Sequence, residues 1–183
     1  MSRLDVVIDL ETMSTLPNAA IVSIGAVAVR DRVPVGEFYV RVQLETALDV
    51  GCVVDGHAME WWLHQDKAAR REVDGSQEAG SLYQALADLE AWLQQTAAGD
   101  RFLVWGKGPS FECTILTSAY RAFRRDAPWY FRDERCMRTL LDLYPEAGDL
   151  PFEGIQHHAL HDARHEAAQL IMALTLHESR PAA

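Results

Sequence analysis

LDVVIDLE, residues 4–11, is the stretch that decides the fold. Residues 4–10 are mostly β-branched or aliphatic, too few for a helix and apolar on both faces, which is typical of a central buried strand. Side chains two positions apart on a strand project from the same face, so Asp9 and Glu11 are expected to converge where this strand ends. The stretch therefore predicts a sheet with two carboxylates at one strand end.

The rest of the chain alternates between strand-like and helix-like patterns. Leucines at positions 82, 86, 89 and 93 fall on one side of a helix, and prolines predict turns over residues 16–18 and 33–36. We expect strands over residues 4–10, 21–29, 38–42, 102–105 and near 130–132, and helices over 58–63, 78–95, 110–123, 136–144 and 160–176. A mixed α/β sheet covered by helices on both faces is the natural packing for this order.

The composition fits one domain that spans residues 1–183. Apolar residues make up 49% of the chain, which is enough for a core without disulfides, and no repeat or linker suggests a second domain. We expect flexible ends at residues 1–3 and 178–183. Cys52, Cys113 and Cys136 are odd in number and far apart, which predicts reduced thiols in a cytoplasmic protein rather than a zinc ribbon. No apolar run is long enough for a membrane segment.

The net charge of −10 at first argues against a nucleic-acid partner, because phosphate binding normally requires a basic surface. The distribution of charge matters more than the sum. Residues 121–138 contain six arginines and only three acids, which makes a local basic region in an acidic chain. A solvated helix face would explain this region equally well.

Four acids from separate segments are candidates for a metal site. Asp9 and Glu11 follow a buried strand, where clustered negative charge is costly unless a cation holds it. Glu112 and Asp162 each begin a predicted helix, where an acid also interacts well with the helix dipole, so neither is diagnostic alone. Together the four carboxylates suit two Mg²⁺ or Mn²⁺ ions, which prefer oxygen ligands. His157 could then take the proton of an attacking water near neutral pH.

These residues resemble the motifs of the DEDDh, or DnaQ-like, exonuclease superfamily. The chain has Asp9-Leu10-Glu11, then Phe111 followed by an acid, then His157 five residues before Asp162. The stretches VIDLETMSTLPNAAIVSIGAV, EWWL, VWGKGPSFECTIL and HHALHDA are most similar to the phage and prophage branch, DexA-like or exodeoxyribonuclease VIII-like. The similarity spans nearly the whole chain.

The resemblance implies an RNase H-like fold with a mixed five-stranded sheet and helices on both faces. It also implies 3′-to-5′ hydrolysis of a nucleic acid to nucleoside 5′-monophosphates with two metal ions. Asp9, Glu11 and Asp162 would be metal ligands and His157 the general base, while Glu112 stands where the motif usually has Asp. Lys107 replaces an Asn that often precedes that acid by five residues.

The substrate side of the site is less specified. A single-stranded 3′ end is the expected partner, because the terminal nucleotide must reach the carboxylates. RNA and DNA remain equal alternatives. A homodimer is left open by analogy. Adjacent tryptophans on a helix point about 100° apart, so at most one of Trp61 and Trp62 should face a substrate. Candidate substrate contacts are Thr12, Met13, Lys107, Phe111 and Trp62.

Two other functions compete with a nuclease. The histidines at positions 157, 158, 161 and 165 could form a transition-metal site, although no HExxH is present and an HD-type phosphohydrolase would need an all-helical fold. The chain could also be a nucleic-acid-binding module that lost catalysis through Glu112. A pure binder would have little need for His157 together with three further acids, so the nuclease is preferred.

Shortening Glu112 tests the departure from the motif. Glu adds a methylene, and a misplaced ligand can cost about 10²-fold in rate. We expect the parent protein to be active but slower than Glu112→Asp in an exonuclease assay. If hydrolysis falls in Glu112→Asp, the longer acid is instead adapted to this site.

Overall fold

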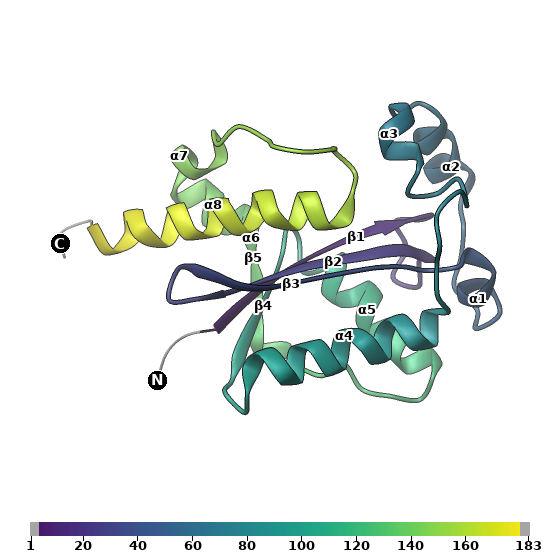
Figure 1. Ribbon diagram of the computed structural model, residues 1–183, viewed down its shortest axis with the longest axis horizontal. Helices are drawn as coiled ribbons and strands as arrows, with labels where there is room; N and C mark the ends of the chain where they lie inside the picture. Colours follow the sequence, from purple (N-terminus) through teal and green to yellow (C-terminus); the bar gives the residue numbers. More distant parts are fainter. Residues whose placement is uncertain (1–3, 180–183) are drawn as a thin grey trace.

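The computed structural model describes residues 4–179 and places one mixed sheet between two layers of helices (Figure 1). The sheet has five strands in the order β3-β2-β1-β4-β5. β1 pairs antiparallel with β2 and β2 with β3, whereas β1–β4 and β4–β5 are parallel. The strands are β1 (Leu4–Thr12), β2 (Ile21–Arg30), β3 (Val33–Arg41), β4 (Phe102–Gly106) and β5 (Glu134–Cys136). The predicted α/β class and five-stranded mixed sheet are confirmed, with β1 in the centre.

Helices cover both faces of this sheet. In Figure 1, α8 lies above the sheet, with α6 and α7, and α4 and α5 lie below it. The long helices are α4 (Leu82–Ala97), α5 (Glu112–Ala122) and α8 (Ala159–Ser179). Shorter ones are α1 (Leu44–Leu48), α2 (Gly56–Leu63), α3 (Lys67–Arg70), α6 (Met137–Leu143), α7 (Pro145–Gly148) and the 3-10 turn η1 (Phe131–Asp133). No helix within residues 4–179 is both long and apolar enough to cross a membrane.

Alternation along β1 assigns its side chains to the two layers. Val6 and Ile8 are fully buried in the core that also contains the α4 and α5 leucines. Val7 faces the opposite way and packs in a second core with Ala163 and Leu170 of α8. Asp9 and Glu11 project from the same face of the strand as Val7, so the acids of β1 lie on the face of the sheet that α8 covers.

Two segments differ from those predicted. Residues 33–36 lie in β3, not in a turn; the turn is formed by Asp31 and Arg32, with φ of 48° and 66°. Pro34 is accommodated because β3 is an edge strand and the register with β2 shifts beside it. The fifth strand lies at residues 134–136, not near 130–132, where the chain forms the exposed η1 turn.

The chain ends also differ in part from expectation. α8 continues to Ser179, so residues 178 and 179 are helical, contrary to a flexible end beginning at 178. The other residues expected to be flexible, 1–3 and 180–183, lie outside the described part of the chain.

Gly25 allows α8 to approach the sheet closely. It lies opposite Asp9 in the β1–β2 register. A Cβ at this position would lie 2.2 Å from the backbone carbon and oxygen of Ala159, the first residue of α8. Such a separation is impossible without moving the helix, since the atoms are backbone atoms. Gly25 therefore sets the depth at which the first turn of α8, and Asp162 with it, sits over β1.

Gly25→Ala should displace the start of α8 and destabilise the protein. Overpacking of this kind costs about 1–3 kcal/mol, which for a chain of this size lowers Tm by about 3–10 °C. Thermal unfolding of purified variants measures the effect. The control is Gly80→Ala, where an added Cβ meets nothing within 4 Å. Equal Tm values for the two variants would show that α8 does not depend on this contact.

Candidate active site

A cleft of about 590 Å³ lies at the carboxyl end of β1. Asp9, Glu11 and Thr12 reach it from β1, and Asp162 and Glu166 from α8. Glu112 enters from the first turn of α5, and His157 from the loop before α8. The structure thus brings the predicted catalytic and metal-binding residues into one cleft.

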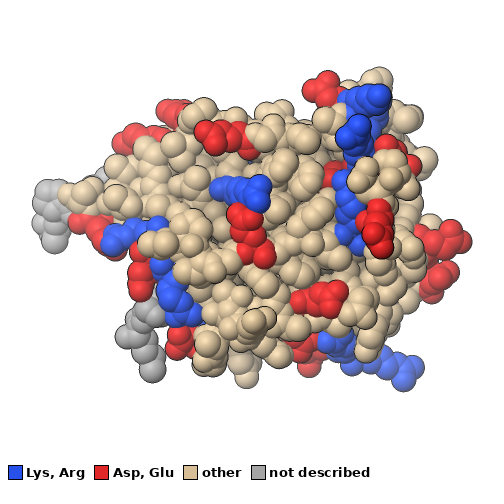
Figure 2. Space-filling view, viewed as in Figure 1, with Lys and Arg blue, Asp and Glu red and all other residues tan. Residues whose placement is uncertain are grey.

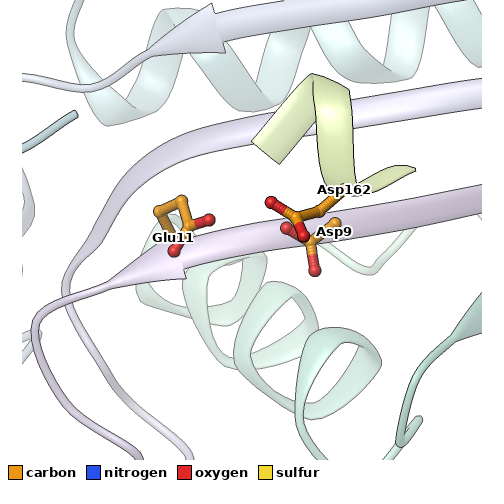
Figure 3. A group of neighbouring side chains, drawn as sticks. All are labelled: Asp9, Glu11 and Asp162. Atoms are coloured by element: carbon orange, nitrogen blue, oxygen red, sulfur yellow. The ribbon is translucent and has the colours of Figure 1, made fainter. Parts of the chain in front are cut away.

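Three carboxylates form the centre of the cleft. Oxygen atoms of Asp9, Glu11 and Asp162 all lie within 4.8 Å of one another (Figure 3). Asp9 and Glu11 project from alternate positions of β1, while Asp162 descends from the first turn of α8. The backbone N–H of His158 donates to Asp162 Oδ2 at 3.1 Å, which fixes that carboxylate against the start of its own helix. Such a cluster of hard oxygen ligands fits Mg²⁺ or Mn²⁺.

The electrostatics of this cluster favour a cation. Burial, with the charges of Glu166 and Glu11, raises the pKa of Asp9 well above its usual value. Burial and the charge of Asp162 raise the pKa of Glu11 in the same way, and burial also raises the pKa of Asp162. The folded protein therefore holds these acids at an electrostatic cost that a divalent ion would relieve.

Glu112 lies in the same cleft but outside the compact group of three. Its Oε2 accepts a hydrogen bond from the backbone N–H of Gly108 at 3.3 Å. A Cβ on Gly106 would lie only 2.4 Å from this oxygen. The longer side chain thus folds back over the turn between β4 and α5, into space that Gly106 leaves open.

His157 lies beside Asp162 in a strained backbone conformation. Its φ is 62°, in the left-handed region that non-glycine residues seldom adopt. Its ring contacts Trp61 edge-on, with 4.7 Å between ring centroids. Its charge when protonated would lower the pKa of Asp162, which reflects how near the two groups are. The loop and Trp61 together aim the imidazole into the cleft.

The candidate substrate contacts divide into two groups. Thr12, Lys107 and Phe111 line the cleft as expected. Met13 does not: it is 8% exposed and packs in the core beneath the sheet, which contradicts its expected role as a substrate contact.

The tryptophan pair is arranged so that only one ring is accessible. Trp62 borders the cleft but is 3% exposed, and its Nε1–H donates to the Thr12 carbonyl at 2.9 Å. Trp61 is 40% exposed on the cleft wall. Trp62 therefore supports β1, contrary to its expected role as a substrate contact, and Trp61 is the exposed ring of the pair on the cleft wall.

The histidine cluster is not assembled as a metal site. His158 stacks between Tyr39 and His161, with centroid distances of 4.6 Å and 4.1 Å. His161 Nδ1 accepts from the backbone N–H of Ile155, and His165 packs on Phe152. Among residues 4–179, the group with metal-ligand spacing is Asp9, Glu11 and Asp162.

Some arginines of the basic region at residues 121–138 are occupied by partners within the fold. On the face shown in Figure 2, Lys and Arg side chains alternate with Asp and Glu. Within this region, Arg125 pairs with Glu90, and Arg135 donates to the backbone carbonyls of Arg132 and Glu134. Arg138 lines the cleft. Sequence reasoning gave no reason to single it out from the other five arginines.

Asp9→Asn should raise the stability of the protein in a chelator. The raised pKa of Asp9 means that its charged form is disfavoured in the folded state at neutral pH, so a neutral amide removes that cost. We expect Tm to rise by about 3 °C or more at pH 7.5. The advantage should shrink as the pH falls toward 3.8, the ordinary pKa, since the parent aspartate then becomes protonated. Thermal unfolding across this pH range measures it.

Asp49→Asn, at an exposed position after α1, is the matched control and should leave Tm unchanged. Saturating Mn²⁺ should reverse the order of the two Tm values, because the ion stabilises the parent more than Asp9→Asn. A lower Tm for Asp9→Asn in chelator would contradict the electrostatic cost inferred for the cluster.

Known nucleases share this fold. The nuclease domain of 3′hExo, a DEDDh family member solved bound to rAMP, is 15% identical and superimposes with a TM-score of 0.65 over 97% of this chain and 94% of that one. Exonuclease X, solved with 5′ overhanging duplex DNA, is 17% identical with a TM-score of 0.61, covering 96% and 94% of the two chains. E. coli exonuclease I, solved with an oligonucleotide, is 15% identical with a TM-score of 0.59, and this chain spans only 41% of it. These likenesses establish the RNase H-like fold.

The family is given by a sequence model. No curated protein matches the chain, but residues 4–174 match the 3′-5′ exoribonuclease Rv2179c-like domain. This match does not confirm the DexA-like branch that the motifs resemble, and it favours an enzyme over a non-enzymatic binding module. The chain belongs to the 3′-5′ exoribonuclease Rv2179c-like domain family and is a 3′-5′ exonuclease.

Proposed function

We propose that the protein hydrolyses the terminal phosphodiester bond at the 3′ end of single-stranded RNA and releases nucleoside 5′-monophosphates, using two Mg²⁺ or Mn²⁺ ions and His157 as general base. The observation that carries this proposal is the compact group of Asp9, Glu11 and Asp162, with oxygens within 4.8 Å of one another, in one cleft with His157. RNA is preferred over DNA because the family model describes exoribonucleases.

The acids supply the ligands for the ions. Asp9, Glu11 and Asp162 form the fixed part of the ligand set, and Glu112 is close enough to raise the pKa of Asp9 through its charge. Divalent ions bound there would polarise the scissile phosphate and stabilise charge on the leaving 3′ oxygen.

His157 accepts the proton of the attacking water. A neutral imidazole nitrogen takes this proton as the water oxygen bonds to phosphorus and the bond from phosphorus to the 3′ oxygen of the preceding nucleotide breaks. The released nucleotide keeps its 5′-phosphate. The contact with Trp61 holds the ring in place before substrate arrives.

The walls of the cleft suit the end of a single strand. Trp61 and Phe111 provide aromatic surfaces on which terminal bases can stack irrespective of sequence. Lys107 and Arg138 provide positive charge for backbone phosphates. A paired end would have to separate before its terminal nucleotide could enter a cleft of about 590 Å³.

His157→Ala should lower kcat by about 10²–10⁴-fold, because general-base catalysis contributes on that order. RNA and DNA oligomers of one sequence, labelled at either end, are digested with Mg²⁺ or Mn²⁺. A 3′ label should appear at once as a mononucleotide, whereas a 5′ label should pass through a ladder of shortened strands.

The control is His64→Ala, which removes an exposed histidine at the end of α2, outside the cleft lining. It should cut at the parent rate, and a chelator should abolish cutting by both. Equal rates for His157→Ala and the parent would exclude His157 as the base. Faster cutting of DNA than RNA would overturn the proposed substrate.

A further inference from the structure

Glu166 is a buried acid of the cleft that the motifs do not include. It lies on α8 four residues after Asp162, so the two side chains project from the same face of the helix. It lines the same cleft, yet it is only 1% exposed. A buried carboxylate needs partners for both of its oxygens, and glutamates are rarely buried without them.

Only one of the two oxygens of Glu166 has a partner among the described residues. Oε1 lies 3.4 Å from the ammonium of Lys107. Oε2 is buried and has no hydrogen-bond partner within residues 4–179. Leaving such an oxygen unsatisfied is costly, and a cation in the cleft would account for it.

The surroundings of Glu166 connect it to the other acids. Among the neighbouring charges that raise the pKa of Asp9, that of Glu166 has the largest effect, ahead of Glu11, Asp162 and Glu112. The charge of Glu112 in turn acts on Glu166. Glu166 therefore lies near both Asp9 and Glu112 in the cleft that all three line, with Lys107 beside it.

We propose that Glu166 is a fifth carboxylate of the metal site, with Oε2 a ligand for a divalent ion that it shares with Asp9, and with Lys107 neutralising Oε1. This inference rests on the proposed function, because it presumes that the cleft binds divalent ions. The competing explanation is that Glu166 only anchors Lys107. In that case its charge would matter only as long as the lysine is present.

A double-variant cycle of Mn²⁺ binding separates these roles. Calorimetric titration of the full chain with Mn²⁺ alone is compared for the parent, Glu166→Gln, Lys107→Met and the double variant. Glu166→Gln should bind Mn²⁺ about 10–100-fold more weakly than the parent. If Glu166 is a ligand, the double variant remains well below Lys107→Met in affinity. If Glu166 only anchors the lysine, the double variant binds as Lys107→Met does, which overturns the proposal.

Controls keep the result interpretable. Glu178→Gln, at the exposed end of the same helix, should bind Mn²⁺ like the parent. Far-ultraviolet circular dichroism in chelator should show that Glu166→Gln retains its fold, as expected when a neutral amide replaces a buried charge. A parent that binds no Mn²⁺ would refute the proposed function itself. A parent that binds Mn²⁺ and degrades RNA, beside a Glu166→Gln variant of equal affinity, would refute only the role of Glu166.

Discussion

Mutual repulsion among buried carboxylates is the constraint on which the rest of this structure depends. Water screens charges at a protein surface but not buried ones. The repulsion between buried like charges therefore grows as the local dielectric constant falls. Apolar packing close to the cluster offsets this repulsion. Val7 of β1 packs with Ala163 and Leu170 of α8, within a turn or two of the acids. The hydrophobic contact between β1 and α8 thus holds together two segments that their charges drive apart.

The loop before α8 is held by a second buried polar group. Glu72, which follows α3, accepts hydrogen bonds from Ser23 of β2 and from Tyr39 and Arg41 of β3. The ring of His158 stacks on Tyr39 and lies 3.7 Å from Glu72. The backbone N–H of the same His158 donates to Asp162. One residue therefore joins the α3 segment, the sheet edge and an acid of the proposed metal site, and it adjoins the strained His157. The energy of that network can maintain the unfavourable backbone conformation of His157, the proposed base.

The sequence was sufficient for the parts of the site that depend on periodicity. Asp9 and Glu11 follow from the alternation of a strand, and Asp162 from the start of a long amphipathic helix. The features that periodicity missed depend on long-range packing. Which tryptophan is exposed follows from a hydrogen bond between Trp62 and Thr12, fifty residues apart in sequence, and the burial of Met13 follows from the core beneath β1.

The position of the fifth strand was missed for a related reason. A strand is predicted near residues 130–132, but pairing with β4 begins only at Glu134, opposite Val104. The partner strand β4 sets this register. The local sequence around residue 134 does not show where that pairing begins. Glu166 could have been found, since its spacing of four from Asp162 places both on one helix face. Its burial, which makes it informative, could not.

The two glutamates contributed by helices give the site an asymmetry. Asp9, Glu11 and Asp162 are fixed by the central strand and by the close approach of α8 at Gly25, so their oxygens have little freedom. Glu112 and Glu166 come from α5 and α8, and each is held by a local contact: Glu112 by the backbone N–H of Gly108 and Glu166 by Lys107. In the proposed site, three acids are therefore positioned by the contact between β1 and α8, and these two glutamates by local contacts of their own. The absence of a Cβ on Gly106, which leaves room for the folded-back Glu112, is the backbone's part in accommodating the longer acid.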